Sequence, residues 1–410
     1  MSEWQKVNLG DCCEITSSKR IFFSEYVESG IPFYRSKEII EKGKGEEISH
    51  PLYISKEKYD EIKGKYGVPQ KGDLLLTAVG SLGIPFVVKD DSPFYFKDGN
   101  LVWLKHFQDI DPIFLYYWIK SENGYNALYN IAIGSAQKAL TIAAIKGYEI
   151  PLPPLQTQHR IANILSRYDS LIENYQKQIK LLEEAAQRLY KEWFVDLRFP
   201  GHENTKIVDG VPEGWEKKKL CELFSFVRGK SYTSKELSDE GTIMVNLKNI
   251  QSFGGYKSDV EKHFIGTFKE EQTLMKGDLI MGVTDMTQER RLVGSVALIP
   301  DFKETATFSM DLIKLISFKL PNIYLYCAMR YGDVSRQIAP LANGVNVLHL
   351  KPEAISNIEM VVASDSIIEK FVSYTSKTIE SILSLQSQLR LLTEARDRLL
   401  PKLMSGEITV

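Results

Sequence analysis

The feature that most constrains the fold of this 410-residue chain is an internal repeat with an offset of 210 positions. At that offset "LLEEAAQRL" (181–189) falls on "LLTEARDRL" (391–399), and Ile161 falls on Phe371. Further upstream Trp4 matches Trp215, and "KGDLLLTAVGSLG" (71–83) matches "KGDLIMGVTDMTQ" (276–288) with small length changes. Because repetition at a fixed offset indicates a repeated structural unit, the sequence predicts that a variable segment followed by a long helix occurs twice.

Each copy ends in a stretch of helical periodicity. We expect the first helix to run from Thr157 to about Val195, roughly 58 Å at 1.5 Å per residue, and to end before Pro200 and Gly201. A helix of this length with one apolar seam needs a partner, and the simplest partner is its own repeat, packed either antiparallel or parallel. The seam predicted from the 3-4 spacing comprises Ile161, Ile164, Tyr168, Leu171, Tyr175, Gln178, Leu182 and Leu189 in the first helix and Phe371, Tyr374, Leu385, Gln388, Leu392 and Leu399 in the second.

Two glutamines occupy the same seam position in the two helices. Gln178 and Gln388 are 210 residues apart. One interpretation places both at the edge of the helix interface. The other makes them a polar pair that fixes the register between the helices at some cost in stability.

The variable segments, residues 1–150 and 211–356, have the pattern of mixed α/β domains. Short apolar runs such as "DLLLTAV", "PFVV" and "NLVWL" indicate strands bounded by Gly and Pro. "DPIFLYYWIKSENGYNALYNIA" has a helical period, and "PNIYLYCAMRYGDVSRQIAP" corresponds to it in the second segment.

Polar loops interrupt these elements at corresponding places in the two segments. They combine Arg and Lys with Ser, Thr, Gln and Asn, the side chains that contact phosphates and base edges in DNA. The bland alternative is that most of these side chains are merely solvated. The candidate DNA-binding residues are Thr16, Ser17, Ser18, Lys19, Arg20, Arg35, Lys37, Ser81, Ser135, Gln137 and Lys138 in the first segment and Arg228, Lys230, Ser231, Tyr232, Lys248, Thr284, Thr287, Gln288, Arg290, Arg291, Asn343 and Asn346 in the second.

Composition narrows the class of protein. The chain has 51 Lys and Arg against 53 Asp and Glu, a net charge of −2, so any positive charge for DNA must be concentrated on particular loops. The cysteines show no CxxC spacing and the six histidines are scattered, so we expect no metal site and a reducing, cytoplasmic location. No apolar run approaches the roughly 18 residues of a membrane span.

Signatures of DNA-modifying enzymes are missing from the sequence. It contains no Asn/Asp-Pro-Pro-Tyr/Phe tetrapeptide, and "PLPPLQ" lacks both the polar and the aromatic member. "GKS" (229–231) resembles the end of a phosphate loop, but Phe224 stands where the first glycine is required. Two domains that carry polar loops and are joined by helices are typical of a binding protein. We therefore expect that the chain is not an enzyme.

Several motifs resemble those of the specificity (S) subunits of type I DNA restriction–modification systems. They are "IPLPPLQTQHRIANIL" (150–165), "RLYKEWFVDLRFPGH" (188–202), "GVPEGWEKKKL" (210–220), "KGDLLLTAVGSLG" and "GSAQKALT". The resemblance extends from Trp4 to about Met404. The second copy departs from the family pattern in "TDMTQERRLVG" and in a distal helix that lacks the proline lead-in.

The resemblance implies a fold and a function. The fold is mixed α/β: two similar globular target recognition domains, separated by two long helices that pair as an intramolecular antiparallel coiled coil, with an internal pseudo-two-fold repeat. The domains are residues 1–150 and 211–356, and the helical spacer regions are 151–210 and 357–410. Each recognition domain would read one half of a bipartite, asymmetric double-stranded DNA site, with the helices setting the gap.

The resemblance also implies partners and a cofactor. Two modification (methyltransferase) subunits would dock on the helices and carry S-adenosylmethionine, and restriction (motor/nuclease) subunits would complete the assembly; this chain itself would hold no cofactor. Two rival hypotheses are a cytoplasmic scaffold that tethers two protein-binding domains without a role in DNA, and an enzyme that binds S-adenosylmethionine itself.

Overall fold

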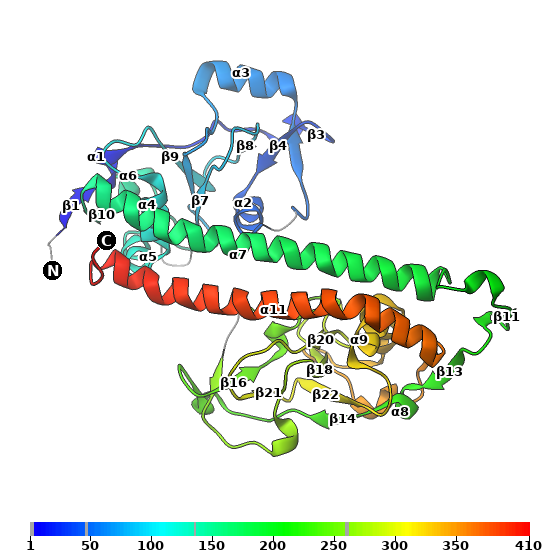
Figure 1. Ribbon diagram of the computed structural model, residues 1–410. Coiled ribbons are helices and arrows are strands. Elements are labelled where there is room, and N and C mark those ends of the chain that lie inside the picture. Colours follow the sequence, from blue (N-terminus) through cyan, green and yellow to red (C-terminus); the bar gives the residue numbers. More distant parts are fainter. Residues whose placement is uncertain (1–3, 46–47, 135–136, 259–261) are drawn as a thin grey trace. The chain divides into compact units, whose positions relative to one another are not determined.

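The computed structural model describes residues 4–45, 48–134, 137–258 and 262–410 (Figure 1). The chain divides into two compact units. Unit 1 comprises Met1–Glu173 and Glu394–Val410, and unit 2 comprises Asn174–Thr393. Both units therefore contain one end of each long helix.

Unit 1 is built on two four-stranded sheets. The antiparallel first sheet has the order β2-β9-β6-β7, and the second has the order β3-β5-β4-β8, in which only β4 and β8 are parallel. A separate antiparallel pair joins β1 to β10. The strands are β1 (Gln5–Asn8), β2 (Glu14–Thr16), β3 (Tyr26–Val27), β4 (Ile31–Tyr34), β5 (Leu52–Ile54), β6 (Leu74–Thr77), β7 (Pro85–Val87), β8 (Tyr95–Phe96), β9 (Leu101–Lys105) and β10 (Glu149–Leu152).

Helices cover these sheets and begin where the sequence supplies caps. The Asp111 carboxylate accepts hydrogen bonds from the amides of Ile113 and Phe114, and Ser121, which separates α4 from α5, accepts one from Gly124. Such caps satisfy amides that the helix itself leaves unpaired. The helices are α1 (Leu9–Cys12), α2 (Ser36–Gly43), α3 (Lys56–Tyr66), α4 (Pro112–Lys120), α5 (Glu122–Asn130) and α6 (Ile142–Lys146).

Unit 2 repeats this topology. Its sheets have the orders β14-β22-β18-β20 and β15-β17-β16-β21, again with one parallel pair, β16 and β21, and β13 pairs with β24 as β1 does with β10. The repeat read from the sequence is therefore confirmed strand by strand. The strands are β13 (Glu216–Lys219), β14 (Phe224–Arg228), β15 (Leu237–Ser238), β16 (Thr242–Val245), β17 (His263–Phe264), β18 (Leu279–Gly282), β20 (Val296–Leu298), β21 (Ala306–Phe308), β22 (Leu312–Ser317) and β24 (Glu359–Val362).

The two units differ in what connects their strands. Where unit 1 has α2 after β4 and α3 after β5, unit 2 has single 3₁₀ turns, Leu247–Asn249 and Glu270–Gln272. Unit 2 adds the short pairs β11–β12 and β19–β23. Its remaining elements are α8 (Leu220–Leu223), α9 (Asn322–Tyr331), α10 (Val334–Ile338), β11 (Ile207–Val208), β12 (Val211–Pro212), β19 (Thr284–Asp285) and β23 (Leu348–His349).

The long helices are α7 (Leu155–Tyr190), which continues into a π-helical turn over Lys191–Val195, and α11 (Asp365–Met404). In unit 1 the beginning of α7 meets the end of α11, where Arg396 Nη1 donates to Asp169 Oδ1 at 2.8 Å. In unit 2 the end of α7 meets the beginning of α11, where the rings of Phe194 and Phe371 lie 4.9 Å apart. Both contacts require antiparallel helices, which confirms the predicted pairing.

The buried face of the helices differs from the predicted seam. In α7 the buried apolar residues are Ile161, Ala162, Leu165, Ile172, Ile179, Ala186 and Tyr190. Leu171 and Gln178 are exposed, and Ile164, Tyr168, Tyr175, Leu182 and Leu189 are half-buried. In α11 Phe371 is buried as predicted, Leu385, Leu392 and Leu399 are half-buried, and Tyr374 and Gln388 are exposed. The seam of α7 thus lies about one residue beyond the predicted positions.

The helices also bury side chains against their own globular parts, which explains this difference. In unit 2 the Arg330 guanidinium of α9 makes two hydrogen bonds to the Glu183 carboxylate of α7, at 2.8 and 2.9 Å. Gln386 of α11 donates to the Tyr256 carbonyl, and Arg390 donates to the Phe302 carbonyl. A helix with two packing partners buries a wider face than a coiled-coil seam.

The structure supports the interpretation that Gln178 and Gln388 lie at the edge of the helix interface. Gln178 and Gln388 are both exposed, and Gln388 donates to Ser384 of its own helix. A buried register-fixing pair is therefore not formed, and that hypothesis is wrong for this structure.

The predicted domain boundaries stay a prediction. The boundary at 150–151 falls within β10, that at 210–211 falls between β11 and β12, and that at 356–357 precedes β24. The compact units divide the chain inside the long helices instead.

Candidate nucleic-acid interface

One end of the first sheet gathers the predicted loops of unit 1. In the antiparallel register Thr16 pairs with Trp103, Thr77 with Leu101, and Leu76 with Pro85. The end of β2, the end of β6 and the beginnings of β7 and β9 therefore lie together. We call this the loop end of unit 1: residues 16–20, 78–84, 97–100, 133–134 and 137–139.

Backbone contacts hold these loops to one another. Ala139 pairs with both Val79 and Ile133 in isolated bridges, and the Leu140 amide donates to the Ala78 carbonyl at 2.9 Å. Ser17 Oγ donates to the Leu101 carbonyl at 3.4 Å. Three segments far apart in the sequence are thus brought together, although Ser135 lies outside the described residues.

The side chains at the loop end of unit 1 differ in their exposure to solvent. Lys19, Arg20, Ser81 and Gln137 are exposed; the Lys19 ammonium lies 4.8 Å from the Tyr66 ring centre, and Lys138 lies 3.7 Å from that of Tyr129. Arg20 is 69% exposed and pairs with Asp98 at 2.9 Å, a surface ion pair of the kind that costs little to exchange for a phosphate or base. Thr16 and Ser17 are half-buried, and Ser18 is buried, so the prediction that Ser18 contacts DNA does not fit its position.

Arg35 has a different role from the predicted contact with DNA. It precedes α2, its amide donates to Glu38 Oε2 at 2.8 Å, and its guanidinium pairs with the same carboxylate. Glu38 is fully buried; burial by itself raises the pKa of this carboxyl, but the hydrogen bonds from Arg35 outweigh it and lower the pKa. Moving the guanidinium to a base would leave a buried carboxylate unpaired. Lys37, which lies 3.7 Å from Glu41, is exposed.

The loop end of unit 2 is built in the same way. Arg228 pairs with Ile313, Gly282 with Leu312, and Met281 with Val296 in the sheet, so the loops at 228–235, 283–295 and 309–311 lie at one end. Residues 343–346 join them, because Gln288 Nε2 donates to the Val345 carbonyl at 2.8 Å and β19 pairs with β23.

Most predicted residues of this end are reachable from solvent. Arg228 is 61% exposed and pairs with Glu353 at 2.6 Å, and Arg291 pairs with Glu289 at 2.6 Å. Ser231, Lys248, Thr287, Gln288, Asn343 and Asn346 are exposed, whereas Lys230 and Tyr232 are half-buried. Thr284 is buried and donates to Asp311 at 3.0 Å, so the prediction that it contacts DNA does not fit its position.

Two acids that we did not predict, the buried Asp285 and the half-buried Asp311, shape the loop that follows β18. Asp285 accepts hydrogen bonds from the amide and hydroxyl of Thr287 and, at 2.8 Å, from the amide of Leu292. Asp311 accepts from Thr284. An Asp at a strand end is a recognisable turn signal, and here it fixes the backbone of residues 286–291.

Arg290 stands out within that loop. It is half-buried, its backbone has a φ of 54°, and its Nε has no hydrogen-bond partner among the residues that the structure describes. An L-residue in the left-handed region is strained, and an unpaired guanidinium nitrogen is costly to bury. Both features favour a group supplied from outside, such as a base edge.

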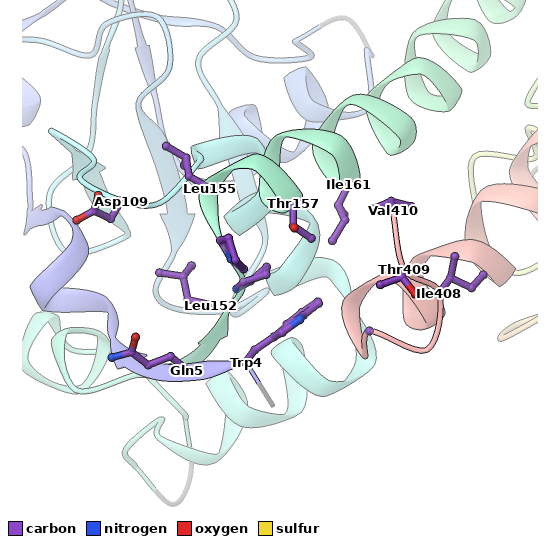
Figure 2. Close-up of a pocket in the computed structure, with 13 residues that line it drawn as sticks. Trp4, Gln5, Asp109, Leu152, Leu155, Thr157, Ile161, Ile408, Thr409 and Val410 are labelled. Atoms are coloured by element: carbon purple, nitrogen blue, oxygen red, sulfur yellow. The ribbon is translucent and has the colours of Figure 1, made fainter. Parts of the chain in front are cut away.

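A cavity elsewhere in unit 1 suits DNA poorly. It measures about 600 Å³ and lies where β1, β10, the start of α7 and residues 406–410 meet (Figure 2). Trp4, Leu152, Ile161 and Ile408 line it, Asp109 supplies the charge, and no basic side chain is present. Within the described ranges no cluster could hold a metal ion and no helix is long and apolar enough to cross a membrane.

Comparison with known proteins shows which family the chain resembles. Residues 1–184 match the family model described as type I restriction modification DNA specificity domain. The type I restriction enzyme MjaIX specificity subunit of Methanocaldococcus jannaschii is 28% identical over 354 residues, covering 83% of this chain and 78% of that protein. The HindI specificity subunit of Haemophilus influenzae is 23% identical, with full coverage of both chains.

Residues 1–184, a little under half of the chain, match this specificity domain, and the chain as a whole is similar to the specificity subunits of type I restriction–modification systems. The fold agrees with this, since a crystal structure of the type I S subunit from M. genitalium superposes with a TM-score of 0.60 at 18% identity, covering 98% of this chain and 96% of that one. Specificity subunits are the non-catalytic members of such systems. The individual DNA-binding residues stay a prediction.

Proposed function

We propose that the two units of this specificity subunit read the two halves of a bipartite, asymmetric DNA site and that α7 and α11 set the gap between the halves. Recognition of a DNA target is the function of the specificity-subunit family that this chain resembles. The division of labour between the units and the role of the helices are our proposal.

The observation that supports this proposal is that the two units contain the same sheet but different loops at its end. Both units place polar loops at the same end of a sheet with the same strand order. Those loops carry different side chains: Arg20 and Gln137 in unit 1, Arg228, Gln288 and Arg290 in unit 2. Since sequence is read by the donors and acceptors that face the base edges, two such ends would prefer different half-sites.

The helices have the length that a spacer needs. α7 contains 36 residues, or about 54 Å at 1.5 Å per residue, and it is stabilised within each unit by a charged pair with another element. Half-sites one turn of DNA apart lie roughly 34–36 Å from one another. A helix of this length is long enough to span that separation.

The chain would act within a larger assembly. We propose that two modification subunits dock on the helical regions and supply S-adenosylmethionine and the methylation chemistry, and that restriction subunits complete the complex. Phosphate contacts shared with these partners would compensate for a net charge of −2. We also propose that the assembly acts in the cytoplasm.

A salt series tests the DNA function. Binding of a duplex target by the reconstituted complex with modification subunits should weaken steeply with salt, log K falling in proportion to log salt with a slope of about −0.9 for each phosphate neutralised. A scaffold without a role in DNA, an alternative that the comparisons do not support, predicts no such slope. A flat line would overturn the proposal.

An insertion tests the spacer. Four residues added near the exposed Gln187 should lengthen α7 by about 6 Å and shift the tolerated gap between half-sites. The measurement is binding to duplexes that carry the same half-sites at a series of separations. A preferred gap that does not move after the insertion contradicts the spacer role while leaving the reading of half-sites intact.

Calorimetry tests the remaining hypothesis, an enzyme with its own methylation chemistry. The isolated chain should release no heat of binding with S-adenosylmethionine, whereas the modification subunit should. Binding by this chain alone would contradict the proposed location of the cofactor.

A further inference from the structure

Two adjacent phenylalanines in unit 1 are held out into solvent. Phe22 is 61% exposed and Phe23 is 87% exposed. Single exposed apolar residues are common on protein surfaces, but a contiguous apolar patch beside charged residues marks a contact site. The residues immediately before the pair are Lys19, Arg20 and the buried Ile21.

The backbone that carries the pair is firmly anchored. Ile21 is 5% exposed and belongs to the core cluster of Phe33, Ile54 and Tyr95. The Lys19 amide donates to the Tyr95 hydroxyl at 2.7 Å. The rings therefore project from a fixed point that follows the loop end directly.

A short turn fixes the two rings further. The Phe22 amide donates to Glu25 Oε2 at 2.7 Å, and the Glu25 amide donates to the Phe22 carbonyl at 2.9 Å. Lys58 holds the Glu25 carboxylate at 2.9 Å, and the Phe23 ring meets the Tyr26 ring edge-on at 5.7 Å. Exposed rings on a preorganised turn lose little entropy when they bind.

Unit 2 contains the same turn without the rings. Thr233 and Ser234 occupy the corresponding positions, both exposed, before β15. The Thr233 amide donates to Glu236 Oε2 at 2.8 Å, and the Glu236 amide donates to the Thr233 carbonyl at 3.0 Å. The turn therefore forms with small polar residues, so folding does not require the phenylalanines of unit 1.

We propose that Phe22 and Phe23 form an apolar wedge that enters the DNA duplex and partly unstacks one base step in the half-site read by unit 1. This rests on the proposed function. Phenylalanine is among the residues that insert between base steps, and the adjacent Lys19 and Arg20 supply the charge that holds the flanking phosphates. Flexible pyrimidine–purine steps yield most easily to such a wedge, so unit 1 should prefer one there.

The test uses the full chain in complex with its modification subunits and duplexes that carry 2-aminopurine, which fluoresces when it is unstacked, at successive positions. The variant Phe22→Thr with Phe23→Ser copies the residues of unit 2. Wild type should show raised fluorescence at one step of the half-site read by unit 1. The variant should lose that signal and bind about 5- to 150-fold more weakly, the range expected for one lost aromatic–base stack.

Two controls sharpen the result. The slope of log K against log salt should be unchanged in the variant, because no charge is removed. The reciprocal variant, Thr233→Phe with Ser234→Phe, should leave the signal in the half-site of unit 1 unchanged. Fluorescence from an adenine drawn out by the methyltransferase itself should persist in both variants.

The outcomes separate this inference from the proposed function. Equal affinity and fluorescence of wild type and the Thr-Ser variant would overturn the wedge while specific binding remains. A variant that no longer assembles with the modification subunits would also overturn it, because the rings would then contact protein. Wild type that binds no DNA specifically would overturn the proposed function and the wedge together.

Discussion

Unit 1 and unit 2 have the same strand orders, yet different elements connect those strands. Unit 1 uses the helices α2 and α3 where unit 2 uses single 3₁₀ turns, and the turn before β3 carries Phe22 and Phe23 where the one before β15 carries Thr233 and Ser234. The sheets must bury the same pattern of apolar residues to form a core, whereas the loops are constrained only at their ends. The comparison shows that the sheets are constrained to one topology, whereas the loops proposed to contact DNA can differ between the units.

A second contrast concerns the packing around the equivalent tryptophans. In unit 2 the Phe199 ring lies 5.0 Å from that of Trp215, and Phe194 lies 5.6 Å from it. In unit 1 the residues at the corresponding positions are Thr409 and Met404, and Trp4 lines the cavity of about 600 Å³ (Figure 2). Smaller side chains at one repeat position thus leave space that aromatic rings fill at the other.

The largest expected effect is a loss of stability on removing the ion pairs that hold the long helices, Arg330–Glu183 in unit 2 and Arg396–Asp169 in unit 1. In unit 2 the Arg330–Glu183 pair is 10% and 14% exposed, while in unit 1 the Arg396–Asp169 pair is 20% and 22% exposed. Glu183→Ala should cost about 3–5 kcal/mol of unfolding free energy, because it leaves a buried guanidinium unpaired. Asp169→Ala should cost about 1–3 kcal/mol, since solvent can reach Arg396 more easily.

Urea denaturation of the full chain measures both losses. Glu184→Ala is the matched control: that residue pairs at 3.7 Å with an Arg188 that is 83% exposed, and its loss should cost no more than about 0.5 kcal/mol. A larger loss for Asp169 than for Glu183 would contradict the ranking of the two anchors. The Tyr117 hydroxyl also donates to Asp169 at 2.7 Å; burial, together with the Asp169 charge, raises its pKa, so it remains a donor.

Next in size are the base contacts of the two loop ends. Arg20→Ala and Arg290→Ala should each weaken specific binding by about 1–3 kcal/mol if a bidentate base contact is lost. Each variant should relax sequence preference only in the half-site read by its own unit. The measurement is binding to duplexes mutated one base pair at a time, with Lys37→Ala as a control for general charge loss. Unchanged preferences in both arginine variants would remove these two assignments.

The smallest expected effect concerns the turn after β4 in unit 1, which is capped by the charged Glu38, and the turn after β16 in unit 2, which is capped by the neutral Asn249. The amide of Arg35 bonds to Glu38 in unit 1, and at the corresponding place in unit 2 the Asn246 amide bonds to Asn249 Oδ1 at 3.0 Å. The pKa of Glu38 is lowered in the folded state. The ionised Glu38 carboxylate therefore contributes to the free energy of unfolding above the unfolded pKa of about 4.3. That contribution is lost as the pH falls through the lower pKa of the folded state.

Glu38→Gln tests this difference. The variant should be less stable than wild type by about 1–2 kcal/mol at pH 7, and the two should converge as the pH is lowered below about 4.3. Asn249→Ala serves as the comparison, because its cost should not vary with pH over the same range. A Glu38→Gln cost that is independent of pH would show that the charge of this cap contributes nothing.

Sequence predicted the large features because they are repeated or periodic. The duplicated unit, the strands β6, β7 and β9, the pairs α4–α5 and α9–α10 and the two long helices all follow from apolar spacing and punctuation. It also identified the polar loops, but not that they meet at one end of a sheet. It misplaced the seam of α7, because Leu171 and Ile172 both satisfy a 3-4 pattern and only packing against a second surface selects one of them.

Side-chain roles were harder to predict than elements. Ser18 and Thr284 belong to polar loops by sequence, yet both are buried. Arg35 has the type of a base reader, yet it neutralises Glu38. The signals that sequence reasoning missed were the aspartates at strand ends and the exposed phenylalanine pair, since polarity alone was taken to mark the contact surface.

The sequence by itself determined that two like domains share a helical frame, because a repeat and a helical period are properties of residue order and need no knowledge of contacts. The tertiary structure alone decided which arginines are free to meet DNA, which glutamines stay at an edge, and which rings protrude. Some of those outcomes depend on partners more than 50 residues away in the chain, such as Arg20 with Asp98 and Gln288 with Val345. Pairing at such separations is fixed only when the whole core closes.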